Sequence, residues 1–145
     1  MKITIRKATE NEYRAIIHLL ASNALPTADI YEKNITLFVG LIDEKIIATI
    51  GIETYGEVAL LRSLCVKDEL KNQKLGEKML SYLLSFCTHE KIETLYLLTT
   101  TAERYFVRHS FEKITREETP LAIQQTREFQ DICPASAVVM ACNIT

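Results

Sequence analysis

A polar segment between an apolar strand and a helix carries the most informative side chains of this sequence. Residues 58–66 are nearly all apolar, residues 67–74 are polar, and an apolar stripe at helical spacing begins at Leu75. A loop that opens a helix presents unpaired backbone N–H groups and the positive end of the helix dipole, which together bind phosphate. Lys71 and Lys74 add positive charge. The segment therefore indicates a phosphate site, although it contains neither G-x-x-x-x-G-K nor G-x-G-x-x-G, and a solvated charged loop would have the same composition.

Two charged residues lie in otherwise apolar strands. Glu53 is at the end of a predicted strand, where a carboxylate can serve as a general base, and Arg62 lies inside the next strand. A guanidinium binds carboxylates and related oxyanions through two parallel hydrogen bonds, so Arg62 is a candidate clamp for a substrate carboxylate, phosphinate or arsenical group. The alternatives are structural. Glu53 would then be a salt-bridged carboxylate at a strand end, and Arg62 would pair internally with Glu53 or another acid.

The composition is that of a folded protein and excludes several classes of function. The 145 residues are 48% hydrophobic and 25% charged, which excludes a disordered chain and predicts a single domain over residues 1–145. Because the formal net charge is −2, we do not expect nucleic acid as a partner. No apolar run approaches the roughly 18 residues of a membrane span, and residues 1–6 show no signal peptide. We therefore expect a cytoplasmic protein with no membrane partner.

The cysteines and histidines form no recognisable metal-binding pattern. Cys65, Cys87, Cys133 and Cys142 each lie among apolar residues and none are in C-x-x-C spacing. We interpret them as buried, reduced thiols and expect no metal site.

Strand and helix patterns alternate along the chain with short connections. Strands are predicted at 3–5, 35–42, 45–53, 58–66, 92–99, 111–115 and 135–144, and helices at 9–21, 75–90, 101–108 and 119–130. Asp43 and Glu44 indicate a β-hairpin between two of the strands. The helix at 75–90 should join its flanking strands as a right-handed crossover. This order predicts a three-layer α/β fold with a mixed central sheet of about seven strands, helices on both faces, and a ligand site where strand pairing is interrupted.

Two stretches of the chain resemble motifs of the GNAT superfamily of N-acetyltransferases. Residues 64–66 (Leu-Cys-Val) and 71–76 (Lys-Asn-Gln-Lys-Leu-Gly) are similar to the end of that family's fourth strand and the Arg-Gly-x-Gly-x-Gly/Ala loop that follows. Residues 102–111 are similar to its Ala-x-x-Phe-Tyr-x-x-x-Gly-Phe segment. Residues 25–29, 51–53, 60–64, 97–102, 126–129 and 133–140 further resemble the small N-acetyltransferases of arsenic-resistance operons and the acetyltransferase domain of N-acetylglutamate synthase.

The resemblance implies a GNAT-type fold, acetyl-CoA as acetyl donor, and a small amine or amino-acid-like acceptor, with a homodimer as a common assembly. By position it assigns cofactor binding to Leu64, Cys65, Val66, Lys71, Asn72, Gln73, Lys74, Leu75, Gly76, Glu77 and Phe106. Backbone N–H groups near Leu64 and Val66 would polarise the thioester carbonyl. Apart from the resemblance, Arg127 and Ser136, near the last predicted helix and strand, are candidates for a second substrate contact beside Arg62, and the alternative for Arg127 is a surface role.

The departures from the family pattern leave other functions open. Lys71 replaces an arginine, Asn72 and Lys74 replace glycines, and Ser110 replaces the glycine before Phe111. Phe106 stands where many members have a tyrosine that protonates the departing thiolate, which makes Tyr105 the fallback acid. We therefore keep three functions open: acetylation of amino-acid-like amines, including arsenical or toxic analogues; N-acetylglutamate-synthase-like activity; and a non-catalytic acetyl-CoA-binding module.

Overall fold

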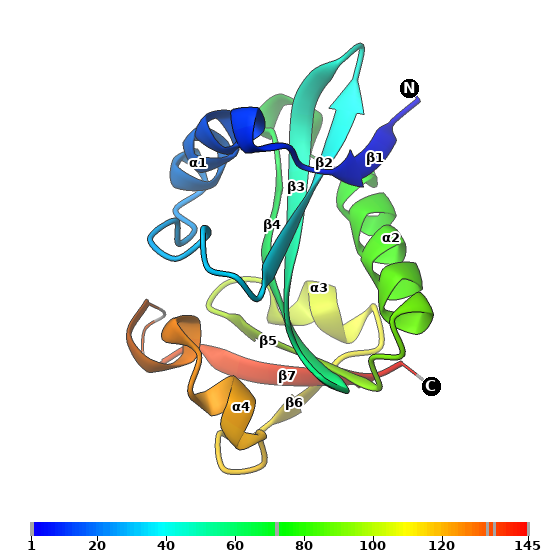
Figure 1. Ribbon diagram of the computed structural model, residues 1–145. Helices are drawn as coiled ribbons and strands as arrows, with labels where there is room; N and C mark the ends of the chain where they lie inside the picture. Colours follow the sequence, from blue (N-terminus) through cyan, green and yellow to red (C-terminus); the bar gives the residue numbers. More distant parts are fainter. Residues whose placement is uncertain (1, 72, 133, 135, 145) are drawn as a thin grey trace.

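The structure is a computed structural model that describes residues 2–71, 73–132, 134 and 136–144 (Figure 1). Its strands are β1 (Thr4–Lys7), β2 (Ile35–Ile42), β3 (Lys45–Tyr55), β4 (Val58–Val66), β5 (Thr94–Thr99), β6 (Glu112–Ile114) and β7 (Val138–Asn143). Its helices are α1 (Tyr13–Ser22), α2 (Leu75–His89), α3 (Glu103–Val107) and α4 (Leu121–Gln124), with short turns η1 (Glu10–Glu12), η2 (Asp68–Leu70) and η3 (Glu128–Ile132). The strands form one sheet in the order β1-β2-β3-β4-β5-β7-β6, which confirms the predicted mixed α/β fold of seven strands.

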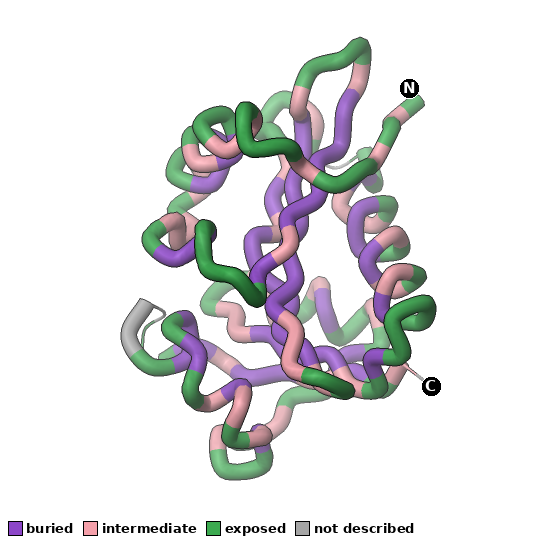
Figure 2. Tube along the Cα trace, in the orientation of Figure 1, coloured by how far each residue is buried: buried purple, intermediate pink, exposed green. Residues whose placement is uncertain are grey.

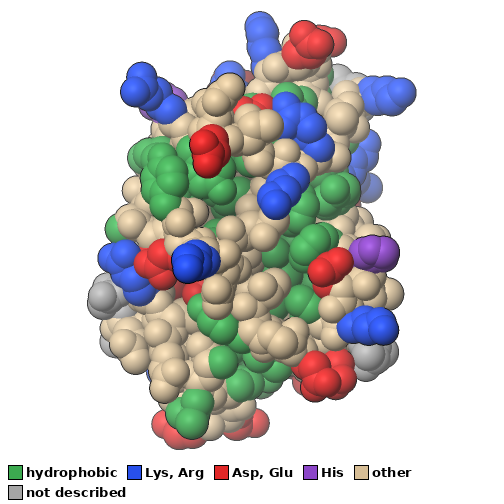
Figure 3. All heavy atoms as spheres, viewed as in Figure 1, with side chains coloured by type: hydrophobic (Ala, Val, Ile, Leu, Met, Phe, Trp, Pro, Cys, Tyr) green, Lys and Arg blue, Asp and Glu red, His purple; other side chains and the backbone are tan. Residues whose placement is uncertain are grey.

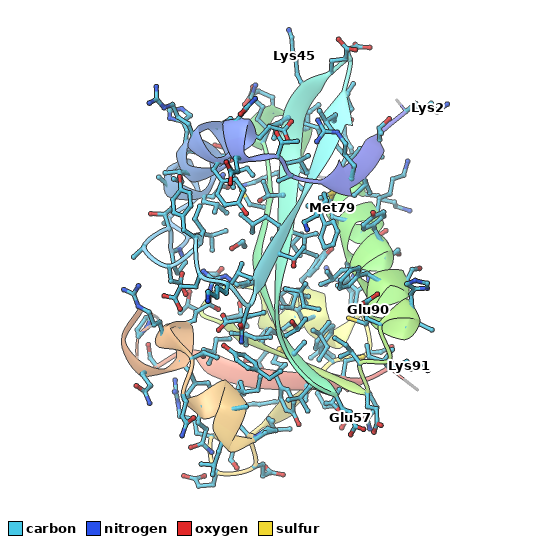
Figure 4. All side chains as sticks on the ribbon, in the orientation of Figure 1. Lys2, Lys45, Glu57, Met79, Glu90 and Lys91 are labelled. Carbon is cyan, nitrogen blue, oxygen red and sulfur yellow. The ribbon has the colours of Figure 1, made fainter. Side chains whose placement is uncertain are left out.

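The first four strands form an antiparallel meander. Asp43 and Glu44 make the predicted β2–β3 turn, with φ values of 51° and 65°. Two consecutive positive φ values are what a type I′ turn requires, and this turn matches the twist of the two strands. The hairpin tip next to Lys45 extends past the helices (Figure 4).

Helices α1 and α2 cover opposite faces of this meander (Figure 1). The buried side chains of α2 recur every three or four residues and match the predicted stripe: Leu75, Met79, Leu80, Leu83 and Cys87. Met79 lies on the side of α2 that faces the sheet (Figure 4). Burial of each large apolar side chain contributes about 1.5–3 kcal/mol. The central strands are accordingly buried along most of their length, while the outward faces of the helices are exposed (Figure 2).

The second half of the sheet contains β5, β7 and β6, which pair antiparallel and run across the lower end of the meander in Figure 1. β5 joins β4 in parallel through the α2 crossover. On the face drawn in Figure 3, lysine and arginine side chains are spread among acidic ones. No helix in the described part of the chain is long and apolar enough to cross a membrane.

The helix predicted at 119–130 is present only in its first part, because a separate short turn follows it in this stretch. The α-helix ends at Gln124, and η3 begins at Glu128. The buried hydroxyl of Thr126 donates to the Ile123 carbonyl at 2.8 Å and accepts from the Phe129 N–H at 3.2 Å. A threonine hydroxyl that bonds the backbone in this way competes with helical hydrogen bonds and ends the helix.

Candidate functional site

The cleft of the molecule opens where β4 and β5 separate. Residues 58–60 of β4 pair with residues 94–96 of β5. Beyond this point β5 pairs, among the described residues, only with β7, and its other edge is free. A bulge in the β3–β4 register lies opposite this point, with Ser63 at a φ of 57° and the Thr49 hydroxyl donating to the Ser63 carbonyl at 2.8 Å. Bulges bend a strand and increase its local twist. The bend leaves a cleft of about 1100 Å³ between the free ends of β4 and β5, where interrupted strand pairing was predicted.

One end of the cleft is cationic. It is lined by Lys71, Lys74, Arg104 and Arg108, together with the first turn of α2. Lys74 precedes α2 with a φ of 63°, the left-handed conformation that the family's glycine would adopt without strain. The Lys71 amine contacts Asp68 at 2.8 Å and donates to the Asn23 side chain at 2.7 Å. Helix N–H groups and these cations together form an anion-binding end.

Tyr105 lies beside the first turn of α2 with an unsatisfied hydroxyl. In the described part of the chain this buried oxygen has no hydrogen-bond partner. A Cβ built on Gly76 would lie 3.1 Å from it, closer than side chains normally approach, so the glycine lets the Tyr105 hydroxyl pack against the first turn of α2. Burial raises the pKa of Tyr105, and the nearby charge of Glu77 raises it further. The hydroxyl is therefore kept protonated as a hydrogen-bond donor facing the cationic end.

The deep end of the cleft is acidic. The buried guanidinium of Arg62 binds Asp29 through two hydrogen bonds of 2.5 and 2.6 Å, donates to Glu53 at 3.2 Å, and lies 3.5 Å from Glu128. One cation thus faces three buried carboxyl groups that come from three separate segments. We call these four residues the acid cluster. The sequence left open an internal pair between Arg62 and Glu53, and that pair is present here, which favours this alternative over a substrate clamp.

Burial and charge shift the pKa values of the acid cluster in opposite directions. Burial alone would lower the pKa of Arg62, but the hydrogen bonds that it donates to Asp29 and the charges of Glu128, Asp29 and Glu53 raise it overall. Burial raises the pKa of Glu128 to about 7, with Asp29 and Glu53 adding to the rise and Arg62 opposing it. Arg62 therefore remains charged, while Glu128 exchanges its proton near neutral pH.

The predicted base Glu53 lies outside the cleft lining. Its carboxylate is 3% exposed and accepts a very short hydrogen bond from the Tyr55 hydroxyl as well as the one from Arg62. Burial and this hydrogen bond raise the pKa of Tyr55. Both oxygens of Glu53 are therefore engaged with the chain itself.

The other predicted site residues divide into three groups. Those that line the cleft are Arg62, Leu64, Cys65, Val66, Lys71, Lys74, Leu75, Gly76, Glu77, Tyr105 and Phe106. Three predicted residues lie outside the cleft lining and are exposed: Gln73, Arg127 and Ser136. The Arg127 guanidinium pairs with Glu32 at 3.1 Å. Asn72 lies outside the described residues. Phe106 is buried against Phe111 and Tyr105.

Two residues of the acid cluster, Asp29 and Glu128, were not predicted from the sequence. Both belong to stretches that carry the family resemblance, yet the sequence analysis selected Arg127, the exposed neighbour of Glu128. Two features of the sequence could have pointed to Glu128. A buried arginine such as Arg62 requires acidic partners, and Glu128 lies between Thr126, which can cap a turn, and the apolar Phe129.

The three cysteines that the structure describes are buried thiols, as the sequence predicted. Cys65, Cys87 and Cys142 are free and buried, and burial raises the pKa of Cys65 to about 11 and that of Cys87 to about 12. Cys133 lies outside the described residues. Within the described part of the chain no group of three or more His, Cys, Asp or Glu side chains could hold a metal ion.

The sequence carries a family signature over most of its length. The sequence model of the family described as Acetyltransferase (GNAT) family matches residues 5–114. The chain belongs to the GNAT family of acetyltransferases. Members of this family take the acetyl group from acetyl-CoA, and the cationic end of the cleft and the unsatisfied Tyr105 hydroxyl fit a phosphate-containing donor of that kind.

Solved structures with the same fold include several acetyltransferases. N-acetylglutamate synthase from Neisseria gonorrhoeae, solved with coenzyme A and N-acetyl-glutamate, matches with a TM-score of 0.86 at 15% identity, covering 100% of this chain and 36% of the synthase. A GNAT-family acetyltransferase from Staphylococcus aureus Mu50 matches with a TM-score of 0.82 at 18% identity, covering 99% of this chain and 100% of that one. A Mycobacterium tuberculosis protein solved in complex with CoA matches with a TM-score of 0.75 at 16% identity, covering 97% and 98%. No curated protein sequence matches this GNAT chain.

Proposed function

We propose that this chain transfers the acetyl group of acetyl-CoA to the amine of a small, amino-acid-like molecule in the cytoplasm. The observation that carries the proposal is the polarity of one cleft. Its cationic end adjoins the first turn of α2, and its deep end is lined by Arg62 and Glu128 of the acid cluster, with Asp29 and Glu53 paired to Arg62. A phosphate-bearing donor suits the first end and an ammonium-bearing acceptor suits the second.

The residues of the chain have separate tasks in this reaction. Backbone N–H groups of the α2 first turn, with Lys71 and Lys74, hold the pyrophosphate of the donor, which supplies the activated acetyl group when bound. The Tyr105 hydroxyl donates a further hydrogen bond to the donor. The backbone around Leu64 and Val66 polarises the thioester carbonyl. The excess negative charge of the acid cluster attracts the acceptor ammonium.

The acceptor class rests on two separate supports. Because the Neisseria synthase was solved with N-acetyl-glutamate, L-glutamate is the first acceptor to test. Resemblance to the arsenic-associated acetyltransferases extends the class to amino acids that carry a phosphinate or arsenical group. Arg62 no longer supports this choice from within the chain, since Asp29 already occupies its bidentate edge.

The test combines cofactor binding with turnover. Calorimetry should give tight binding of acetyl-CoA and weaker binding of pantetheine, because pantetheine lacks the pyrophosphate. Release of free CoA should then be measured with L-glutamate, L-glutamine, an arsenical amino acid and the decarboxylated amine of each acid. Turnover of the amino acids alone supports the proposed class. Equal turnover of their decarboxylated partners shows that the carboxylate is not recognised. Binding without turnover of any amine would leave the non-catalytic module.

A further inference from the structure

Glu128 lines the deep end of the cleft and has no part in the sequence-based assignment of the site. On the basis of the proposed acetyl transfer, we infer that Glu128, and not Glu53, accepts the proton that the acceptor ammonium must lose before its nitrogen can attack the acetyl carbon. An amine is a nucleophile only in its neutral form, so a positioned carboxylate at this point acts as a general base.

The hydrogen bonds of the two carboxylates differ in the way this role requires. Glu53 already accepts hydrogen bonds from Tyr55 and Arg62. Both of its carboxylate oxygens are therefore already engaged by groups of the chain itself. Among the described residues, Glu128 makes no hydrogen bond through its carboxylate, and its ionic contact is with Arg62 at 3.5 Å. Glu128 therefore keeps lone pairs available to a substrate.

The charges around Glu128 adjust its affinity for a proton. The ionisable groups that face it are Arg62 on β4, Asp29 in the segment between α1 and β2, and Glu53 on β3. Burial and the two acids raise the pKa of Glu128 to about 7 against the effect of Arg62. A base is most effective when its pKa lies near the working pH. An ammonium that enters this cluster also meets an excess of negative charge.

The local backbone fixes the direction of the Glu128 side chain. Thr126 caps the turn through its hydroxyl, and Phe129 is buried among Leu60, Tyr96 and Val139. Between these two anchors, Arg127 points to the surface and Glu128 to the cleft. A base held on both sides in this way is positioned before substrate binds, which reduces the entropy lost in the reaction.

The step balances in protons and electron pairs. The acceptor R–NH₃⁺ gives one proton to the Glu128 carboxylate, and the neutral nitrogen forms a bond to the acetyl carbon. The carbon–sulfur bond breaks with its electron pair on sulfur, and the second proton lost by the nitrogen ends on that sulfur. The products are the amide, the free thiol of CoA and protonated Glu128, which returns its proton to solvent.

The test compares Glu128→Gln with Glu53→Gln, because both changes remove one carboxylate from the same acid cluster. For the best acceptor of the amino acids and amines named above, kcat of the wild type should rise with pH through an apparent pKa near 7. Glu128→Gln should lower kcat by about 10²-fold or more and remove that rise, while the acetyl-CoA affinity is unchanged. Glu53→Gln should retain the rise. Glu128→Asp should recover part of the rate, since it restores a carboxylate.

Each outcome decides between the two assignments. If Glu53→Gln loses the pH dependence and Glu128→Gln keeps it, the base is Glu53 and the inference is wrong. If both variants keep it, neither residue is the base. Should Glu128→Gln fail to fold, Glu128→Asp must still shift the apparent pKa, and an unshifted profile overturns the inference. If the wild type acetylates no amine on the panel, the proposed function itself fails and the assignment of Glu128 falls with it.

Discussion

Replacing Glu128 by glutamine tests whether the stability of the protein depends on the proton that this carboxyl group binds. Burial, with Asp29 and Glu53 nearby, raises the pKa of Glu128 from 4.5 to about 7. The folded protein therefore holds this proton more tightly than the unfolded chain does. It follows that the free energy of unfolding falls as the pH rises from about 4.5 to about 7, and stays low above that range.

The size of this effect follows from the pKa difference. At about 1.4 kcal/mol for each pH unit, a rise from 4.5 to about 7 corresponds to about 3 kcal/mol. Glutamine has the same shape and cannot ionise, so the variant avoids this loss. The difference in unfolding free energy, variant minus wild type, should therefore increase by up to about 3 kcal/mol between about pH 5 and about pH 9.

Urea unfolding at a series of pH values measures this difference, provided that the m-value is the same for both proteins. Glu112→Gln is a matched control, because it removes the same charge from an exposed position on β6. Its difference from wild type should change little with pH. A Glu128→Gln difference that stays flat across the range, or grows toward acid pH, would show that Glu128 is ionised normally and would refute the reasoning.

Three other changes test separate parts of the structure. Ser110→Gly should raise the unfolding free energy by about 1 kcal/mol in urea titrations. The reason is that Ser110 is exposed with a φ of 73°, a conformation that glycine adopts without strain. A loss of stability would contradict this backbone conformation. Tyr105→Phe should leave the free protein as stable as the wild type or slightly more stable, since the Tyr105 hydroxyl has no partner among the described residues. The same change should weaken acetyl-CoA binding about 3- to 10-fold in calorimetry. An unchanged affinity would show that Tyr105 does not contact the donor. Arg62→Met should lower the unfolding free energy by about 3–5 kcal/mol, because three buried acids lose their cation. Adding Asp29→Asn should recover part of that loss. An Arg62→Met variant as stable as the wild type would refute the account of the acid cluster.

Local sequence signals determined the secondary structure and one half of the site. The apolar stripe that begins at Leu75 required a helix, and Asp43-Glu44 required a tight turn, because both depend only on nearby residues. The polar segment at residues 67–74 indicated the cationic end for the same reason: a loop that opens a helix binds anions through its own backbone. The departures from the family pattern were also informative, since Lys74 and Ser110, which replace glycines of that pattern, both have a positive φ, the conformation that glycine adopts most easily.

The acid cluster was decided only by the tertiary structure. Arg62 is a charge in an apolar strand of the sequence, which required an acidic partner; Glu53 was one alternative, but nothing in the pattern pointed to Asp29 or Glu128. Asp29, Glu53 and Glu128 reach it from three separate segments, which are brought together by the loop after α1, the β3–β4 pairing and the turn at Thr126. Glu128 has its raised pKa only because that packing removes water from it and sets other acids beside it. Periodicity and spacing in the sequence do not reveal such contacts. The choice between Glu53 and Glu128 as the general base could therefore be made only from the folded structure.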